Sequence, residues 1–147
     1  MTANDLMTTN FVVCTEDLPL IRVFEQMDIA GVEHAVVVES LAHSMPIGLI
    51  TEHDICEQVI GRARNPRGMT AANVMNTNVK RVNRDIGTDE LARVEGTKIV
   101  CVIDENGKLC GTLNLSSIGQ VLPTHPESRL DGPMIRNYQV SMLNRIY

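Results

Sequence analysis

Two kinds of apolar pattern follow one another along the first part of this chain. Residues 34–38 and 47–50 are short apolar runs, rich in β-branched residues and without a polar face, which is typical of buried strands. Residues 11–14 are also extended in character, whereas apolar side chains recur at helical spacing from Pro19 onward (Leu20, Phe24 and Met27). Residues 51–61 predict a second helix that ends at its terminal glycine. The predicted order is strand, helix, strand, strand, helix.

The second half of the chain repeats this order. Residues 3–11 and 71–79 share Ala, Met, Thr and Asn in register at a spacing of 68 residues, whereas Gly48 and Gly111 match at a spacing of 63. The second copy is therefore slightly shorter than the first. Strands are predicted at 79–82, 99–103 and 109–113, with helices through Leu91 and Val94 and over 116–122. The predicted fold class is α+β, with two β-α-β-β-α repeats.

These repeats suggest the organisation of the whole chain. We expect a first repeat over residues 1–62, a linker over 63–70, a second repeat over 71–122 and a C-terminal extension over 123–147. Because 147 residues is the size of one ordinary domain, the repeats should share a core. The region around the linker carries three arginines, for which a solvated connector is the simplest interpretation.

The C-terminal extension has an apolar stripe of its own. Met134, Tyr138, Met142 and Ile146 recur every four residues, which predicts a helix. Such a stripe can dock on its own domain or against a second subunit.

Composition and charge restrict the partners. The chain is 44% apolar and 21% charged, which is typical of a globular protein, and its formal charge of -5 argues against a nucleic-acid partner. No apolar run is long enough to span a bilayer, and the N-terminus lacks the pattern of a secretory signal. We therefore expect a cytoplasmic protein with no membrane partner.

The reactive side chains do not form a recognisable catalytic or metal-binding set. The four cysteines show no Cys-x-x-Cys spacing and no clustered histidines, so no metal site is expected. Cys101 and Cys110 flank the turn 104–107 and are expected to face each other across a hairpin, as free thiols in a reducing compartment. No nucleophile, base and orienting group occur at a familiar spacing, so neither enzymatic activity nor a prosthetic group is expected.

A Thr and an Asp three residues apart open the helix that follows residues 47–50. Thr51 and Asp54 face the same way at a helix N-terminus, which is the pattern of a capping box. A carboxylate in this place can also accept hydrogen bonds from both hydroxyls of a ribose. The residues alone leave both interpretations open: a helix cap, or part of a ligand site.

The succession of motifs resembles a tandem pair of cystathionine β-synthase (CBS) domains, often called a Bateman module. The resemblance covers residues 3 to 122. It rests on segments that open the two copies, precede their hairpins and follow the first hairpin, namely 5–8, 73–76, 31–38, 96–104 and 48–55. It implies two copies packed about a pseudo-twofold axis through their sheets, with two clefts for adenosine-containing ligands such as AMP, ADP, ATP or S-adenosylmethionine.

By this resemblance, Asp54 holds the ribose diol and Thr51 assists near the sugar or phosphate. The positions that would contact the adenine are Thr15, Val32, His34 and Ala35. Lys98 stands where the family commonly has an arginine that meets a phosphate, and a lysine there supplies a point charge.

The second copy departs from the family pattern. Asn114 and Ser117 stand where the first copy has Thr51 and Asp54, so the second cleft has no charged acceptor for a ribose. Glu33 replaces the arginine that would favour a phosphate there. We therefore expect one occupied cleft per chain.

The resemblance implies a sensor for signal transduction, not a catalyst. The leading hypothesis is a regulatory module that binds an adenine nucleotide and passes its occupancy to an unidentified target protein or through a homodimer. The alternative is an interaction module whose clefts bind no ligand and which acts in dimer or partner assembly. Asp54→Ala separates the two hypotheses. It should abolish nucleotide binding if the chain is a sensor, and it should leave assembly unchanged if the chain is an interaction module.

Overall fold

The computed structural model describes residues 1–118. The first repeat consists of α1 (Ala3–Leu6), β1 (Val12–Cys14), α2 (Leu20–Ala30), β2 (His34–Val38), β3 (Pro46–Thr51) and α3 (Glu52–Ile55), which continues as the π-helical η1 (Cys56–Ile60). The second repeat consists of α4 (Ala71–Val74), β4 (Arg81–Asn83), α5 (Thr88–Leu91), β5 (Ile99–Ile103), β6 (Leu109–Asn114) and α6 (Leu115–Ile118). Residues 1–115 form one compact unit that contains both sheets.

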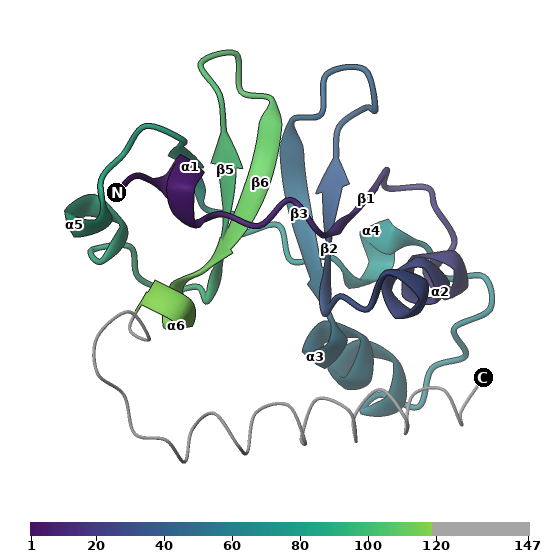
Figure 1. The fold of residues 1–147 in the computed structure, drawn as a ribbon. Helices are drawn as coiled ribbons and strands as arrows, with labels where there is room; N and C mark the ends of the chain where they lie inside the picture. The colour runs from purple at the N-terminus through teal and green to yellow at the C-terminus, as the bar shows by residue number, and fades with distance from the viewer. Residues whose placement is uncertain (119–147) are drawn as a thin grey trace. The chain divides into compact units, whose positions relative to one another are not determined.

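The two sheets have the same topology. In each, the first strand pairs parallel with the second, which pairs antiparallel with the third, giving the orders β1-β2-β3 and β4-β5-β6 (Figure 1). Both antiparallel pairs shift register near the hairpin, between Val37 and Val38 and between Val102 and Ile103. The predicted α+β fold with two β-α-β-β-α repeats is therefore confirmed, with a short helix added before each repeat.

The short leading segment of each repeat pairs with the other repeat. Thr8 exchanges two backbone hydrogen bonds with Thr112 of β6 (2.8 and 3.0 Å), and Asn76 exchanges two with Leu49 of β3 (2.8 and 3.0 Å). The amide of Ala3 donates to the carbonyl of Ile86, and that of Ala71 donates to the carbonyl of Leu18. These matched contacts relate the repeats by a pseudo-twofold axis, and neither repeat is complete without the other.

Two glycines make this exchange possible. A Cβ on Gly48 would lie 2.6 Å from the sulfur of Met75, and a Cβ on Gly111 would lie 2.6 Å from the sulfur of Met7. Each glycine thus admits the methionine that opens the opposite repeat. The repeated Gly and Met positions in the sequence are explained by these two contacts.

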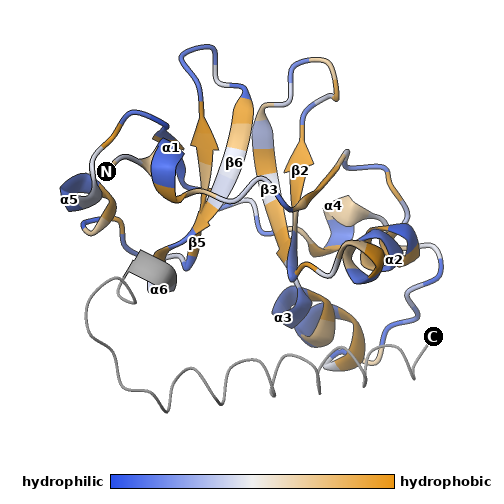
Figure 2. Cartoon of the chain, in the orientation of Figure 1, coloured by the Kyte–Doolittle hydropathy of each residue, from blue (hydrophilic) through white to orange (hydrophobic). Residues whose placement is uncertain are grey.

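The core is shared by the repeats, as expected. Val36, Val38 and Leu49 of the first sheet form one buried cluster with Cys101 of the second. The side chains packed around this cluster also come from both halves: Phe11, Val79, Ile99 and Leu109. Apolar residues follow the strands of both sheets in Figure 2. Because burying one Val or Leu side chain contributes about 1.5–3 kcal/mol, the joint cluster favours the paired arrangement.

The structure corrects some details of the sequence-based prediction. Strand β4 begins at Arg81 and not at residue 79, and α5 spans only Thr88–Leu91. The expectation that Cys101 and Cys110 face each other is wrong, because the register places Cys101 opposite Thr112. All four cysteines are free thiols in the structure. The predicted C-terminal helix, and the end of the helix predicted over 116–122, lie outside the described residues.

Candidate functional site

The end of β3 and the start of α3 place Thr51 and Asp54 together. Thr51 has an extended backbone, and its hydroxyl accepts a hydrogen bond from the amide of Asp54 at 3.1 Å. In return, Oδ2 of Asp54 accepts from the amide of Thr51 at 2.9 Å and from its hydroxyl at 3.0 Å. These hydrogen bonds form a complete capping box, which stabilises the first turn of the helix.

This cap uses only one of the two carboxylate oxygens of Asp54. Within residues 1–118, Oδ1 of Asp54 accepts no hydrogen bond, and the side chain is half-buried. A single carboxylate oxygen has two lone pairs with which it can accept hydrogen bonds. The cap and a ligand contact are therefore compatible at the same residue.

Two other capping boxes in the chain serve as internal references. Asp5 accepts from the amide and hydroxyl of Thr2 at 2.9 and 3.2 Å, and Asn73 accepts in the same way from Thr70 at 2.8 and 3.2 Å. An amide oxygen thus accepts the same two hydrogen bonds in this cap as a carboxylate oxygen does.

His34 lies next to this cap in the sheet but reaches the other repeat. Its backbone is in register with Thr51, while its Nε2 lies 2.8 Å from the hydroxyl of Thr112. The ring of Phe11 stacks on the imidazole with the centroids 6.3 Å apart. Burial lowers the pKa of His34, so the neutral ring is favoured in the folded chain.

Sequence reasoning missed Phe11 and Thr112 as neighbours of this site. Thr112 is only 1% exposed. It occupies the position that corresponds to the apolar Leu49 of the first repeat. The sequence feature that could have indicated Thr112 is a polar residue within an otherwise apolar predicted strand.

Acidic groups lie beside the cap. Glu52 is buried, and its pKa is raised first by desolvation and then by the negative charge of Asp28. The amide of Glu52 donates to the backbone carbonyl of Glu33 at 3.0 Å. In the second repeat, the amide of Leu115 donates to the carbonyl of Lys98 at 2.7 Å. Lys98 and Glu33 therefore occupy equivalent positions, and the exposed Lys98 carries the opposite charge.

The remaining predicted residues lie in different places. Ala35 is fully buried between Val12 and Ile50 in the sheet, so it offers no exposed side chain. Val32 precedes β2, and its amide donates to the carbonyl of Met27.

Thr15 lies at the opposite end of the sheet from Thr51. It follows β1, whose last residue, Cys14, pairs with Val37, whereas Thr51 pairs with His34. Along the strand direction, Thr15 and Thr51 are therefore about four residues apart, which corresponds to about 13 Å. The hydroxyl of Thr15 donates to Asp17 at 2.6 Å. The structure brings Thr51, Asp54 and His34 together and leaves Thr15 apart.

The equivalent corner of the second repeat lacks a carboxylate. Asn114 ends β6 and is exposed, and α6 begins at the next residue. The side chain of Ser117 lies outside the described part of the chain.

No group of His, Cys, Asp and Glu side chains within residues 1–118 could hold a metal ion. No helix in the same residues has the length and apolar character needed to cross a membrane.

The sequence comparisons identify the first repeat. The family model of the CBS domain matches residues 3–61. An uncharacterised protein of Methanopyrus kandleri is 31% identical over 96 residues, which are 63% of this chain and 48% of that protein. This chain therefore spans about half the length of the relative that it matches.

The structural comparisons extend the likeness to both repeats. A hexameric CBS-CP12 protein from bloom-forming cyanobacteria has a TM-score of 0.70 and 24% identity, covering 80% of this chain and 66% of that one. The cytosolic domain of the Mg²⁺ channel MgtE in complex with ATP has a TM-score of 0.67 and 24% identity, covering 82% and 48%.

A third structure carries two adenosine-containing ligands. The CBS domain pair of protein MJ0100, in complex with 5′-methylthioadenosine and S-adenosylmethionine, has a TM-score of 0.64 and 16% identity, covering 82% of this chain and 94% of that one. The architecture is that of two paired α+β repeats. Residues 3–61 match the CBS domain, and the whole fold is similar to that of tandem CBS modules.

Proposed function

We propose that this chain is a regulatory module that binds one adenosine-containing ligand, at the corner formed by β3 and α3, and that it catalyses no reaction. The observation that carries the proposal is the half-used carboxylate of Asp54. Its Oδ2 caps the helix, while Oδ1 has no hydrogen-bond partner within residues 1–118 and can accept from a ribose diol.

The neighbouring groups suit the rest of such a ligand. The resemblance places the adenine at the first residues of β2, His34 and Ala35, and the ligands of two solved CBS structures, ATP and S-adenosylmethionine, share an adenosine. Lys98, exposed at the start of β5, is the candidate to meet a phosphate. The second corner has Asn114 and Ser117 in place of Thr51 and Asp54, and thus no carboxylate for a ribose, so we propose one ligand per chain.

Regulation requires that the ligand favours one arrangement of the protein over another. A ligand with equal affinity for two arrangements shifts neither. Since the site lies where the first repeat meets the second, through His34 and Thr112, the pairing of the repeats is the arrangement that we expect a ligand to stabilise. The target of the signal and the cytoplasmic location stay predictions.

The first test is thermal unfolding of the purified chain with AMP, ADP, ATP, S-adenosylmethionine and a guanosine control. A ligand that binds only the folded state raises its stability by mass action. We expect a selective rise with one adenosine compound and a stoichiometry of one per chain. Two equivalent sites per chain, or no shift with any compound at millimolar concentration, would contradict the proposal.

Asp54→Asn separates ligand binding from helix capping. The cap formed by Thr70 and Asn73 indicates that Asn can accept the two hydrogen bonds from the amide and hydroxyl of the N-cap Thr. We expect this variant to fold with nearly unchanged stability and to bind at least about tenfold more weakly, because hydrogen bonds to a charged group are worth about 1.5–3 kcal/mol. Asp5→Asn makes the same change in the cap of α1 and should leave binding unaltered.

The assembly alternative has its own observation. Ile29 on α2 is 79% exposed and Ile60 at the end of η1 is 45% exposed, so both elements carry apolar surface that a partner could cover. We propose that these helices contribute to a homodimer. Sedimentation of wild type and Ile29→Asp tests this: a concentration-dependent dimer should weaken in the variant, and equal masses would count against this interface.

A further inference from the structure

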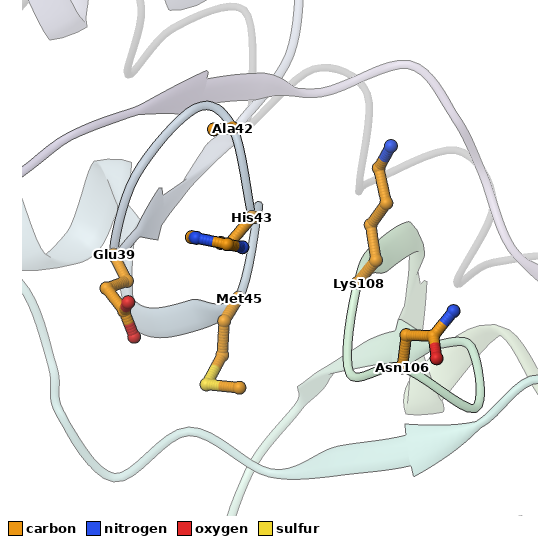
Figure 3. A pocket seen from close by; sticks show the side chains of 6 residues that line it. All are labelled: Glu39, Ala42, His43, Met45, Asn106 and Lys108. Atoms are coloured by element: carbon orange, nitrogen blue, oxygen red, sulfur yellow. The ribbon is translucent and has the colours of Figure 1, made fainter.

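Polar groups where the two repeats meet differ in how far water reaches them. Between the hairpin turns lies a pocket of about 360 Å³, lined by residues of both repeats (Figure 3): Glu39, Ala42, His43, Met45, Asn106 and Lys108. The two charged residues among them are exposed, so water already solvates both charges. At the opposite end of β2, His34 is half-buried and bonds to the buried Thr112. This second pair must satisfy its hydrogen bonds within the protein.

The hydroxyl of Thr112 needs an acceptor for its proton. Thr112 is 1% exposed, and its hydroxyl lies 2.8 Å from Nε2 of His34. Within residues 1–118 this hydroxyl forms no other hydrogen bond. A buried donor without an acceptor costs free energy, so the arrangement in which Thr112 donates to Nε2 is favoured.

The proton of the neutral imidazole is then on Nδ1. Burial lowers the pKa of His34, which favours the neutral ring. A neutral imidazole has one N–H donor and one acceptor nitrogen, and Nε2 is already the acceptor for Thr112. In the described part of the chain, Nδ1 has no hydrogen-bond partner and is not among the polar atoms that are buried without one. His34 therefore offers a free N–H donor that a ligand can reach.

The register of the sheet places this donor beside the candidate site. His34 is directly opposite Thr51 in the antiparallel pair of β2 and β3. Side chains of directly opposite residues lie on the same face of a sheet, with Cβ atoms about 4.5–5.5 Å apart. The ring of Phe11 stacks on the imidazole and restricts its rotation. The donor thus lies on the sheet face that carries the side chain of Thr51, next to the cap formed with Asp54.

We infer that Thr112 is a positioning residue for the adenosine site, where it holds His34 as the tautomer whose Nδ1–H donates to a ring nitrogen of the adenine. The ligand in this inference rests on the proposed function, whereas the tautomer is a property of the chain alone. The second repeat then contributes to a site whose other side chains at this corner come from the first repeat. Ligand binding and the pairing of the repeats are coupled through this hydrogen bond.

Nitrogen NMR of the imidazole rings tests the tautomer in the ligand-free chain, at about pH 8, where histidine is uncharged. The signals of His34 are identified by their absence in His34→Gln. We expect the proton on Nδ1 in wild type and in Thr112→Ser, which keeps the hydroxyl. Thr112→Val replaces the hydroxyl by a methyl group and should lose this preference. A proton on Nε2 in wild type, or an unchanged tautomer in Thr112→Val, would overturn the inference.

Calorimetry with adenosine and its 1-deaza, 3-deaza and 7-deaza analogues tests the contact with the base. Each analogue replaces one ring nitrogen by C–H and so removes one acceptor. We expect at least one analogue to bind wild type about fivefold or more weakly than adenosine, because the donor of His34 is left without a partner. This difference should shrink in Thr112→Val and return in Thr112→Ser. Equal binding of all four compounds to wild type, or an undiminished difference in Thr112→Val, would overturn the contact.

Failure of the proposed function would give a different result. If adenosine does not bind at millimolar concentration, the adenosine site and the contact with the base are both wrong, while the tautomer in the ligand-free chain is unaffected. If adenosine binds and Asp54→Asn weakens it, but the deaza analogues bind like adenosine, only the role of His34 and Thr112 is wrong.

Discussion

The two repeats have the same fold but differ at the corner where a ligand contact is expected. In the first, β3 leads into a capping box with a carboxylate, Asp54, whereas in the second the corresponding position is Ser117. The contacts between the repeats are nevertheless matched almost atom for atom, from Thr8 with Thr112 to Asn76 with Leu49. The fold therefore depends on these reciprocal contacts, while the charged residues at the two corners are free to diverge.

The largest effect is expected from breaking the reciprocal contacts themselves. A Cβ on Gly111 would lie 2.8 Å from the backbone oxygen of Thr8 as well as against Met7, whereas the three atoms nearest to a Cβ on Gly48 all belong to the side chain of Met75. Because backbone yields less easily than a flexible side chain, Gly111→Ala should cost about 2–3 kcal/mol and Gly48→Ala about 1 kcal/mol. Denaturant unfolding measures both, and a larger loss in Gly48→Ala would refute this ranking.

The next effect comes from making the two corners alike. The double substitution Asn114→Thr and Ser117→Asp places the first repeat's motif in the second. We expect it to create a second site, because the added carboxylate supplies the acceptor that a ribose needs, worth about 1.5–3 kcal/mol or at least about tenfold in affinity. Calorimetric stoichiometry should rise from one to two ligands per chain. An unchanged stoichiometry would mean that the carboxylate is not what distinguishes the corners.

The cap alone should have a smaller effect. Thr51→Ala removes the hydroxyl that accepts from the amide of Asp54, and loss of such an N-cap costs about 1 kcal/mol. Thr51→Ser keeps the hydroxyl and serves as the control in the same thermal unfolding experiment. Equal stability of the Ala and Ser variants would show that the capping box contributes nothing here.

The smallest effect is expected in the pH dependence. The pKa of His34 in the folded chain lies below its ordinary value of 6.5 because the ring is buried. The unfolded chain therefore binds a proton more readily, so stability falls as the pH drops through 6.5 and levels off below the folded pKa, with a slope of at most about 1.4 kcal/mol per pH unit.

His34→Gln provides the comparison for that experiment. It keeps a polar side chain beside Thr112 without an ionisable ring. Its stability should change less than that of wild type when unfolding is followed from pH 8 to pH 5.5 by denaturant titration. Parallel curves for the two proteins would exclude His34 as the source of the pH dependence.

Local structure could largely be predicted from the sequence. The apolar run 34–38 forms β2 over the same residues, and the capping box at Thr51 opens α3 as expected. The weaker pattern around residues 79–82 was misplaced, since β4 begins at Arg81. Where near neighbours in the chain form a clear apolar pattern, as at 34–38, the strand can be located from the sequence. Where that pattern is weak, as at 79–82, its bounds cannot.

Part of the candidate site was also within reach of the sequence. The pair Thr51 and Asp54 is joined by hydrogen bonds three residues apart, so its geometry is decided locally. The neighbours of His34 were not predictable in this way, because Thr112 lies 78 residues further along the chain. Thr15 was grouped with the other site residues, although the parallel register places it at the far end of the sheet.

The sequence by itself determined the repeat, the order of the elements and the chemical difference between Asp54 and Ser117, because all of these are properties of short segments. Only the tertiary structure decided that each repeat lends its leading segment to the other, that Cys101 faces Thr112 and that Glu39 and Lys108 line one pocket. The physical reason is that register and pairing between distant segments are fixed by joint burial and close packing, which no local pattern of residues specifies.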